Sequence, residues 1–505
     1  MSPGSGAGRP LRILHVASEV APWSQSGGLG EVMGGLPDAQ VAGDPYAHVA
    51  VVTPLYRGVA ERIARAGLAL GEPRHHTVAI DGSSFEAQLR PLVQPGRATL
   101  WFVDVPALYD REGLYGPRHG GDHPDNPVRF AVPCRVAVDL GAELCGGEVD
   151  VLHGHDWQGA LAPVYLRLGP TSPTASVFTV HNLAFRGLLP APMVDVLGLP
   201  WTVFDQRHME FWGELSLLKG GLCYADVATT VSPTYAREIL EPEFGEGLDG
   251  FLRWDVERLA GIRNGVDVAA WDPATDPALP ARFCADDLAG KATCRAALAA
   301  EHGLRIGPDT TIAVVVSRLA AQKGIDLVAE LVPELHALDA RLIVIGSGDP
   351  ALEARLHWLA DHFGDHVAVH LGYDAAMARR AYGGADVLLM PSRFEPCGVG
   401  QLYAMRYGTI PVAHAVGGLR DTVVDPGDDA LCDGRGTGIL FEDVDVGGVR
   451  WGLTRAIRLR RDRPAGWARL VAAAMRHDWS WAAPAAEYLQ LYRSASRARR
   501  TLLGG

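Results

Sequence analysis

The chain has 505 residues, of which 48% are hydrophobic and 21% charged, and its formal net charge is −13. These values are typical of a globular protein with two domains, and so negative a charge without a basic tract argues against a nucleic-acid-binding protein. No apolar run has the length of a membrane-spanning helix, and the seven cysteines form no CxxC pair, which favours free thiols in a cytoplasmic protein.

Short apolar runs separated by helix-like segments recur along the first half of the chain. Strands are expected at residues 11–17, 49–53, 99–105, 149–153, 176–180 and 227–231, and helices lie between most of them, for example at 127–144. Alternating strands and helices predict a parallel sheet with crossover helices. We therefore expect a Rossmann-like domain over residues 1–272, in which residues 1–10 form a loose tail without the apolar core of a signal peptide.

The same alternation returns in the second half. Strands are expected at residues 311–316, 341–346, 366–370, 385–390, 410–413 and 438–441. The proline-rich stretch 271–280 between the two sets is typical of a hinge or linker. We therefore place a second Rossmann-like domain at residues 273–478. Residues 479–505 are expected to form a C-terminal helix, for which the N-terminal domain is one candidate docking surface.

Each half contains a Gly-Gly-Leu turn after a predicted strand, at Gly27-Gly28-Leu29 and at Gly417-Gly418-Leu419. A glycine-rich turn that opens a helix can bind an anion, because free backbone N–H groups and the helix dipole point at the ligand. The repeated turn suggests two similar domains that present helix N-termini to a shared cleft. Taken alone, Gly27-Gly28 fits a plain tight turn better, and the missing GxGxxG fingerprint disfavours a Rossmann oxidoreductase.

Charged residues follow two of the apolar runs in the second half. Arg318 and Lys323 follow the first run, and Glu395 lies in a Pro- and Gly-rich turn after the fourth. Open α/β sheets bind ligands at the carboxyl ends of their strands, and a guanidinium and an ammonium at this spacing can reach one diphosphate. The pattern predicts a sugar and a diphosphate bound side by side. The alternatives are solvated surface cations and, for Glu395, a helix N-cap; Cys397 is expected to be a small buried side chain.

Polar residues also follow two strands of the first half. His153, His155 and Asp156 invite a metal interpretation, but no further residue completes a ligand set, so we expect no metal. His181-Asn182 at a strand end suits hydrogen bonds to sugar hydroxyls, although a single histidine is more often a satisfied core or rim residue.

Three aromatic residues and one turn complete the candidates. Tyr109, Tyr115 and Trp157 lie in or near loops, where a ring can stack on a pyranose, and the core interpretation is comparably good. Asn264-Gly265 is a strong turn signal and is open to a simple structural explanation.

Taken together, the motifs resemble those of bacterial glycogen synthases and plant starch synthases, which are retaining glucosyltransferases of the GT-B fold. The blocks that carry the resemblance extend from Leu11 to about Tyr492. They include residues 26–29, 155–157, 180–184, 231–236, 264–267, 317–319, 322–324, 391–398 and 417–419.

The resemblance implies an α/β fold of two doubly wound domains facing a central cleft. It also implies transfer of glucose from ADP-glucose to the non-reducing end of an α-1,4-glucan such as glycogen, with retained configuration and without a metal or other cofactor. Arg318 and Lys323 would hold the diphosphate, and Glu395 would face the donor sugar. His181 would hydrogen-bond that sugar, and Asp156 would line the sugar or acceptor site. The other implied donor contacts are Gln25, Gly27, Gly28, Asn264, Gln322, Cys397, Gly398, Gly417 and Gly418, and the implied acceptor or sugar contacts are Tyr115, Trp157 and Asn182.

The sequence departs from the family pattern at three places. Gln25 stands where the family has lysine, Glu31 where it has aspartate, and Val399-Gly400 where it has Leu-Thr. The alternatives to ADP-glucose transfer are a catalytically weak or inactive glucan- or nucleotide-binding relative, or the same enzyme acting on UDP-glucose.

Overall fold

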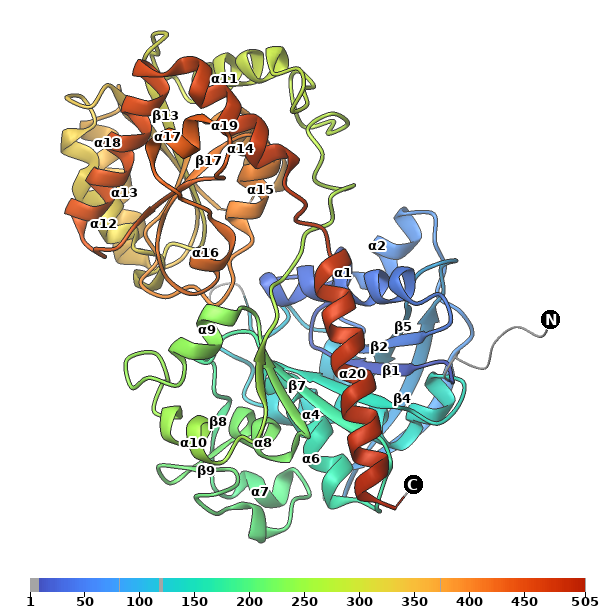
Figure 1. Cartoon of the computed structure of the whole chain (residues 1–505). Coiled ribbons are helices and arrows are strands. Elements are labelled where there is room, and N and C mark those ends of the chain that lie inside the picture. The colour runs from blue at the N-terminus through green and yellow to red at the C-terminus, as the bar shows by residue number, and fades with distance from the viewer. Residues whose placement is uncertain (1–8, 81, 118–120, 373, 505) are drawn as a thin grey trace. The chain divides into compact units, whose positions relative to one another are not determined.

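The computed structural model describes residues 9–80, 82–117, 121–372 and 374–504, and it divides into two compact units (Figure 1). Unit 1 contains the chain up to Gly265 together with the residues from Trp481 onward, and unit 2 is Val266–Ser480. Each unit has its own hydrophobic core and its own central sheet.

A nine-stranded sheet forms the centre of unit 1, in the order β12-β11-β7-β6-β1-β2-β5-β4-β3. Its strands are β1 (Arg12–Val16), β2 (His48–Pro54), β3 (Arg74–Ile80), β4 (Ser83–Leu92), β5 (Thr99–Asp104), β6 (Val151–His155), β7 (Ala175–Val180), β11 (Val227–Thr230) and β12 (Leu259–Gly261). All pairs are parallel except those of β4, which runs antiparallel to both β3 and β5. The six predicted strands of this half are confirmed, and β3, β4 and β12 were not predicted.

The order of the strands reverses between β1 and β6. From β1 the chain adds β2 and β5 on one side, and it then returns to place β6, β7, β11 and β12 on the other. Doubly wound sheets bind ligands at such a switch point, outside the carboxyl ends of the strands. His15 of β1 pairs in register with His153 of β6, so these histidines lie beside the switch point of unit 1.

Helices and a small sheet surround the large sheet of unit 1. The helices are α1 (Gly28–Gly43), α2 (Val59–Arg65), α3 (Pro106–Tyr109), α4 (Asn126–Leu144), α5 (Asp156–Gly159), α6 (Leu161–Leu168), α7 (Met193–Val196), α8 (Leu217–Tyr224), α9 (Pro233–Glu238), α10 (Asp249–Trp254) and α20 (Ala482–Leu502), with a 3-10 turn η1 at Trp201–Val203. The small sheet has the order β8-β10-β9, with β8 at Leu188–Pro190, β9 at Glu210–Phe211 and β10 at Glu214–Ser216.

The C-terminal helix α20 belongs to unit 1, where it packs against α1, β6 and β7 (Figure 1). Its inward face carries Tyr488 and Tyr492, and Trp481 precedes it; all three side chains are buried. The indole of Trp481 lies so close to Gly35 of α1 that a Cβ there would be 2.1 Å from its Nε1. The end of the chain thus completes the core of the N-terminal unit.

Unit 2 is built on a six-stranded parallel sheet in the order β15-β14-β13-β16-β17-β18. The strands are β13 (Thr311–Val316), β14 (Ala340–Gly346), β15 (Val367–Leu371), β16 (Val387–Met390), β17 (Ile410–His414) and β18 (Ile439–Phe441), which confirms all six predictions for this half. Its helices are α11 (Ala289–Glu301), α12 (Ile325–Leu331), α13 (Pro350–His362), α14 (Ala375–Gly384), α15 (Gly400–Arg406), α16 (Gly417–Thr422), α17 (Asp428–Cys432), α18 (Val446–Asp462) and α19 (Pro464–Arg476), with 3-10 turns η2 (Ala321–Lys323) and η3 (Val332–Glu334). The order reverses between β13 and β16, which is the switch point of this unit.

The chain passes between the units before the proline-rich stretch at which the sequence placed the boundary. Val266 and Ser480, the first and last residues of unit 2, form a β-bridge, and the Val266 N–H donates to the Trp479 carbonyl. The two chain segments that connect the units are therefore hydrogen-bonded to each other at this point. The proline-rich stretch is packed within unit 2, because Trp271 stacks on Tyr403 with ring centroids 3.7 Å apart. It is therefore part of a folded surface and not a free linker.

Two expectations about the whole chain can be compared with the structure. No disulfide joins the seven cysteines, all of which lie in the described ranges. Among the described helices, none is both long and apolar enough to cross a membrane.

Candidate functional site

The loops that follow β13 and β16 meet at the switch point of unit 2. The Arg393 N–H donates to the Gln322 carbonyl at 2.8 Å, and the Gln322 side chain donates to the Phe394 carbonyl at 3.3 Å. Gly324, at φ 65°, lets the first loop lie on the second, since a Cβ there would come within 2.0 Å of the Pro391 carbonyl oxygen. Residues predicted from two distant motifs are thus brought together.

Lys323 and Glu395 form a direct ion pair in this place. Lys323 Nζ lies 2.5 Å from Glu395 Oε2, and the Ser392 hydroxyl donates to the same oxygen at 3.0 Å. Glu395 is only 4% exposed, and its backbone carbonyl accepts from the Gly418 N–H at 2.9 Å. The carboxylate is therefore held in one orientation, with the Lys323 ammonium group beside it. The N-cap alternative for Glu395 is not what the structure shows, because α15 begins at Gly400 with Val399 as its cap.

Arg318 is exposed and has little to hold its side chain. The one hydrogen bond of its guanidinium to another described residue joins Nη2 to Gln322 Oε1 at 3.3 Å. A guanidinium has five N–H donors, so most of those of Arg318 remain available to a ligand at the switch point.

The second Gly-rich turn supports the same loop. Cys397 is buried, and its carbonyl accepts from Gln401 Nε2 at 3.0 Å. Gly418, in the first turn of α16, packs so closely on Cys397 that a Cβ would lie 2.3 Å from its Cα. Gly398 and Gly417 lie in the two segments that this contact joins, so the predicted donor residues of unit 2 form one connected group.

In unit 1 the first Gly-rich turn is bound by a buried carboxylate that the sequence analysis did not single out. Glu19 Oε2 accepts from the N–H groups of Ser26, at 2.6 Å, and Gly27, at 3.2 Å, and its Oε1 accepts from the Ser26 hydroxyl at 2.7 Å. These N–H groups are therefore already occupied, and the plain tight-turn interpretation accounts for them. A Cβ on Gly27 or Gly28 would meet no atom within 4 Å, so the outer side of the turn is open.

Tyr115 also binds Glu19. Its hydroxyl lies 2.5 Å from Glu19 Oε1 and 2.8 Å from the Ser18 hydroxyl. Tyr109 is fully buried, with its hydroxyl donating to the Arg129 carbonyl, which supports the core interpretation for that residue. The Tyr115 hydroxyl thus belongs to the network that orders the Gly-rich turn.

Asp156 and His181 meet where β6 and β7 end. The His181 N–H donates to Asp156 Oδ1 at 2.7 Å, and Asp156 has φ 51°, a left-handed conformation that is uncommon outside glycine. Burial raises the pKa of the Asp156 carboxyl to about 7, and the N–H groups of His181 and Asn182 oppose that rise. A carboxyl held in a strained backbone beside a histidine is typical of a functional site.

Two further predicted residues of unit 1, Trp157 and Asn182, have structural partners. The Trp157 ring meets Phe130 edge to face, with centroids 5.3 Å apart, and Asn182 Oδ1 accepts from the Ala184 N–H. Asn264 is 9% exposed and follows β12.

Replacing Asp156 by Asn is expected to change how stability depends on pH. The folded pKa of Asp156 is raised above the unfolded value, so its contribution to stability is complete at low pH and is lost as pH rises through about 7. The introduced amide cannot ionise, so the melting temperature of Asp156→Asn relative to the unsubstituted protein should rise between about pH 5 and about pH 8, on either side of that pKa. An equal difference in melting temperature at both values would contradict the raised pKa.

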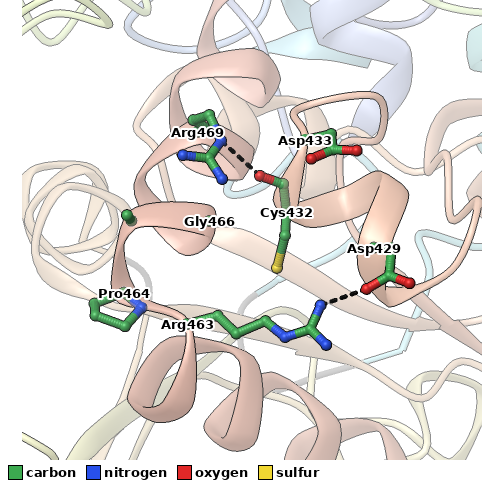
Figure 2. Close-up of a pocket in the computed structure, with 8 residues that line it drawn as sticks. Asp429, Cys432, Asp433, Arg463, Pro464, Gly466 and Arg469 are labelled. Carbon is green, nitrogen blue, oxygen red and sulfur yellow. Dashed lines mark hydrogen bonds and ion pairs between the residues drawn. The ribbon is translucent and has the colours of Figure 1, made fainter.

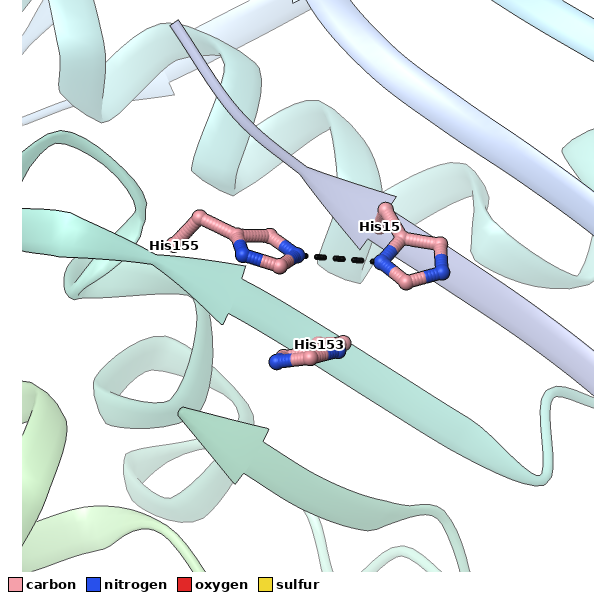
Figure 3. A group of neighbouring side chains, drawn as sticks. All are labelled: His15, His153 and His155. Carbon is pink, nitrogen blue, oxygen red and sulfur yellow. Dashed lines mark hydrogen bonds between the residues drawn. The ribbon is translucent and has the colours of Figure 1, made fainter. Parts of the chain in front are cut away.

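Three buried histidines lie close together beside the switch point of unit 1 (Figure 3). The side chains are His15, His153 and His155, and each offers a ring nitrogen within 4.8 Å of the others. The sequence analysis named His153 and His155 but not His15, which lies in the apolar run of β1. The grouping reopens the question of a metal, and the answer depends on the hydrogen bonds that these rings make.

A pocket of about 540 Å³ in unit 2 contains none of the predicted residues (Figure 2). Its cation Arg463 pairs with Asp429 at 2.6 Å, and Arg469 donates to the Cys432 carbonyl at 2.7 Å. Both cations that line this pocket therefore already have partners in the protein.

Comparisons with known proteins cover almost the whole chain. The family model of the starch synthase catalytic domain matches residues 12–254, and that of glycosyl transferases group 1 matches residues 301–465. A glycogen synthase of Anaeromyxobacter dehalogenans (strain 2CP-C) is 47% identical over 96% of this chain and 99% of its own length. A glycogen synthase of Paramagnetospirillum magneticum is 42% identical over 96% of this chain and 97% of its own.

Solved structures show the same fold. The catalytic domain of starch synthase IV from Arabidopsis thaliana, bound to ADP and acarbose, superposes with a TM-score of 0.85 at 30% identity, covering 97% of this chain and 100% of that chain. A sucrose-phosphate synthase from Thermosynechococcus elongatus has a TM-score of 0.59 at 20% identity, over 97% of this chain and all of that one, and supports the fold alone.

Proposed function

The chain belongs to the glycogen and starch synthase family of GT-B glycosyltransferases, and from this premise we propose that it transfers glucose from ADP-glucose to the non-reducing end of an α-1,4-glucan. It is a hexosyltransferase with glycogen synthase function. The proposal adds the donor, the acceptor bond and the residues that do the work.

One observation carries the assignment of the donor site. At the switch point of unit 2, Arg318 and Lys323 follow one central strand and Glu395 follows the other, with Lys323 and Glu395 in contact. When the bond between the anomeric carbon and the diphosphate breaks, negative charge develops on the leaving oxygen. Cations placed beside the leaving oxygen stabilise that charge. We assign the diphosphate to Arg318 and Lys323 and the glucose to Glu395.

The loops around this pair would complete the donor contacts of unit 2. Gln322 and the Cys397-Gly398 and Gly417-Gly418 segments lie within the connected group described above. The Gln322 amide has a second N–H besides the one that donates to Phe394, and this donor is suited to a phosphate or sugar oxygen.

We assign the residues of unit 1 to the transferred sugar, the acceptor and the outer donor contacts. His181 would hydrogen-bond the glucose, Asp156 would line the sugar or acceptor site, and Asn182, Trp157 and Tyr115 would contact sugar rings. The proposed donor contacts in this unit are Gln25, Gly27, Gly28 and Asn264. The paired strand ends that hold Asp156 and His181 together support the first two assignments most strongly.

A donor panel tests the proposal. Purified protein is incubated with glycogen and radiolabelled ADP-glucose or UDP-glucose, and incorporation into glycogen is measured. The ADP bound to the Arabidopsis starch synthase supports ADP-glucose as the preferred donor. A higher kcat/KM with UDP-glucose would reassign the donor, and no incorporation from either would favour the non-catalytic alternative, to which the named relatives give no support.

The Gln25→Lys variant tests whether the Gly-rich turn of unit 1 contributes to donor binding. Gln25 is exposed, and its Nε2 donates to Oε1 of the half-buried Glu31 at 2.6 Å. An ammonium near a diphosphate gains about 1 kcal/mol at the high effective dielectric of an exposed position, so the Kd for ADP should fall about fivefold. Calorimetric titration measures this, with Gln25→Met as an uncharged control of similar length. Equal affinity in the two variants would mean that residue 25 does not reach the diphosphate.

We also propose a cytoplasmic location. Seven cysteines without a disulfide are consistent with a reducing compartment, where nucleotide sugars are available.

A further inference from the structure

A continuous series of hydrogen bonds leads from His181 into the core of unit 1. His181 Nε2 lies 3.0 Å from His155 Nδ1, and His155 Nε2 lies 3.0 Å from His15 Nδ1. His15 Nε2 in turn lies 2.9 Å from the Gln40 side-chain oxygen of α1. His15, His155 and Gln40 are completely buried, so water cannot replace any of these partners. Figure 3 shows the bond between His15 and His155.

The histidines in this series are neutral. Burial lowers the pKa of His15 to about 4 and that of His181 to about 3, and it lowers the pKa of His155 well below its ordinary value. A neutral imidazole has one N–H donor and one acceptor nitrogen, so the role of one nitrogen decides the role of the other.

The direction of the series follows from its inner end. The Gln40 oxygen can only accept, so His15 must carry its proton on Nε2 and accept at Nδ1. His155 must then donate from Nε2 and accept at Nδ1, and the same reasoning gives His181 an N–H at Nε2. Nδ1 of His181 is left as an acceptor, and it has no hydrogen-bond partner among the residues that the structure describes.

We propose that His155 and His15, held by Gln40, are positioning residues that keep His181 in the Nε2–H tautomer, so that its Nδ1 accepts a hydrogen bond from a hydroxyl group of the bound sugar. The inference rests on the proposed function, because it concerns how His181 meets the glucose. It adds a specific chemical requirement: the ligand must present a donor to this ring, and the ring cannot present one to the ligand at Nδ1.

The hydrogen bonds continue from the amide nitrogen of Gln40 to Tyr492 and His153. Gln40 Nε2 donates to the Tyr492 hydroxyl of α20 at 3.2 Å, and that hydroxyl lies 2.6 Å from His153 Nδ1. His153 Nε2 lies 2.6 Å from the Thr179 hydroxyl, which is 2.5 Å from that of Thr229. Since the Gln40 amide nitrogen donates to Tyr492, its oxygen is the atom that remains for His15.

A metal ion is the competing explanation for the grouped histidines. Both ring nitrogens of His15, His153 and His155 already have hydrogen-bond partners within the protein. An ion would have to break several of these bonds, and the group of possible ligands among the described residues contains no carboxylate to balance its charge. The geometry therefore favours the hydrogen-bonded series, and metal analysis of the purified protein belongs to the test.

The first test is spectroscopic and needs no activity. In the full chain with ¹⁵N-labelled histidine, long-range ¹H–¹⁵N correlation spectra distinguish Nε2–H from Nδ1–H tautomers. The signals of His181 are assigned by their loss in His181→Asn. We expect Nε2–H tautomers for His15, His155 and His181 in the ligand-free protein. A proton on Nδ1 of His181, or one tightly bound metal ion per chain, would overturn the proposal.

The second test uses two variants of one position. His155→Leu removes the acceptor for His181 Nε2–H, whereas the side-chain oxygen introduced by His155→Asn can take the place of Nδ1. His155→Leu is expected to lower kcat/KM for the sugar donor about tenfold, which corresponds to the cost of one unsatisfied buried hydrogen bond. His155→Asn should recover most of this loss. Thr229→Val, which removes an equally buried hydroxyl at the opposite end of the network, should leave kcat/KM unchanged.

The outcomes distinguish a failure of the positioning role from a failure of the proposed function. If Leu and Asn at position 155 give the same kcat/KM, or if Thr229→Val lowers it as much as His155→Leu, the side chains act only on packing and the positioning role is wrong. If the unsubstituted protein transfers glucose from no donor while the spectra show the expected tautomers, the proposed function fails and the tautomer assignment stands.

Discussion

Replacing Glu395 by Ala is expected to lower kcat by about 10²- to 10³-fold while the protein remains folded. The carboxylate is buried, accepts a hydrogen bond from the Ser392 hydroxyl and forms an ion pair with Lys323 at 2.5 Å. Its loss therefore removes the proposed sugar contact and releases the ammonium group that we assign to the diphosphate. Steady-state transfer of labelled glucose to glycogen measures kcat, and circular dichroism with a melting curve checks the fold.

Two further variants test whether the effect depends on the negative charge of Glu395 and on its position in unit 2. Glu395→Gln retains the shape and can still accept from Ser392, so a loss close to that of Glu395→Ala would assign the effect to the negative charge. Glu442 is the matched control, because it is an exposed acid of the same unit in an ion pair with Arg420, and Glu442→Gln should retain full activity. Near-normal turnover of Glu395→Ala would remove this residue from the site.

Replacing Lys323 by Ala is expected to lower kcat/KM for the nucleotide sugar by about 10²-fold, through a higher donor KM, a lower kcat, or both. The chain has three lysines, and the ammonium groups of the other two bind backbone carbonyls: Lys219 those of Gln206 and Glu210, and Lys291 those of Gly383 and Tyr407. Lys323 is instead paired with a carboxylate at the switch point, where a bound diphosphate could draw it away.

The phosphate role of Lys323 can also be tested by the affinity of the protein for ADP. Because Lys323 is assigned to the departing diphosphate, Lys323→Ala should also weaken binding of ADP, measured by calorimetry, whereas Lys323→Arg should retain part of the affinity. An unchanged rate profile and unchanged ADP affinity in Lys323→Ala would refute the phosphate role. A loss of ADP affinity without a change in kcat would mean that the cation binds the ground state and the transition state equally.

The central strands of both sheets could be predicted because they are buried on both faces. Thr311–Val316 and Val387–Met390 are continuous apolar runs, and the second is followed by a turn that contains Pro391, Pro396 and Gly398. The hairpin of β3 and β4 was missed because it is largely exposed, and Arg74 and the two histidines that follow it conceal the alternation of β3. The hairpin joins the large sheet through antiparallel pairing of β4 with β5, the next strand in the chain.

The candidate site also contains residues that the sequence could predict and residues that it could not. Arg318, Lys323 and Glu395 stand directly after strands, so the sequence could predict that they share a strand-end site, but not that Lys323 and Glu395 bind each other. Glu19 could not be recognised, because its role appears only when the turn at Ser26 folds back over it. His15 lies in a short, mostly apolar strand, and its partner His155 lies 140 positions further along the chain.

The most direct test of the donor assignment is a crystal structure of the protein with ADP. The account predicts that the diphosphate lies at the ends of β13 and β16, within hydrogen-bonding distance of the Arg318 guanidinium and of Lys323 Nζ, with Glu395 beside the open end of the diphosphate. ADP bound elsewhere in the protein, with both cations unchanged in their contacts to Gln322 and Glu395, would contradict it.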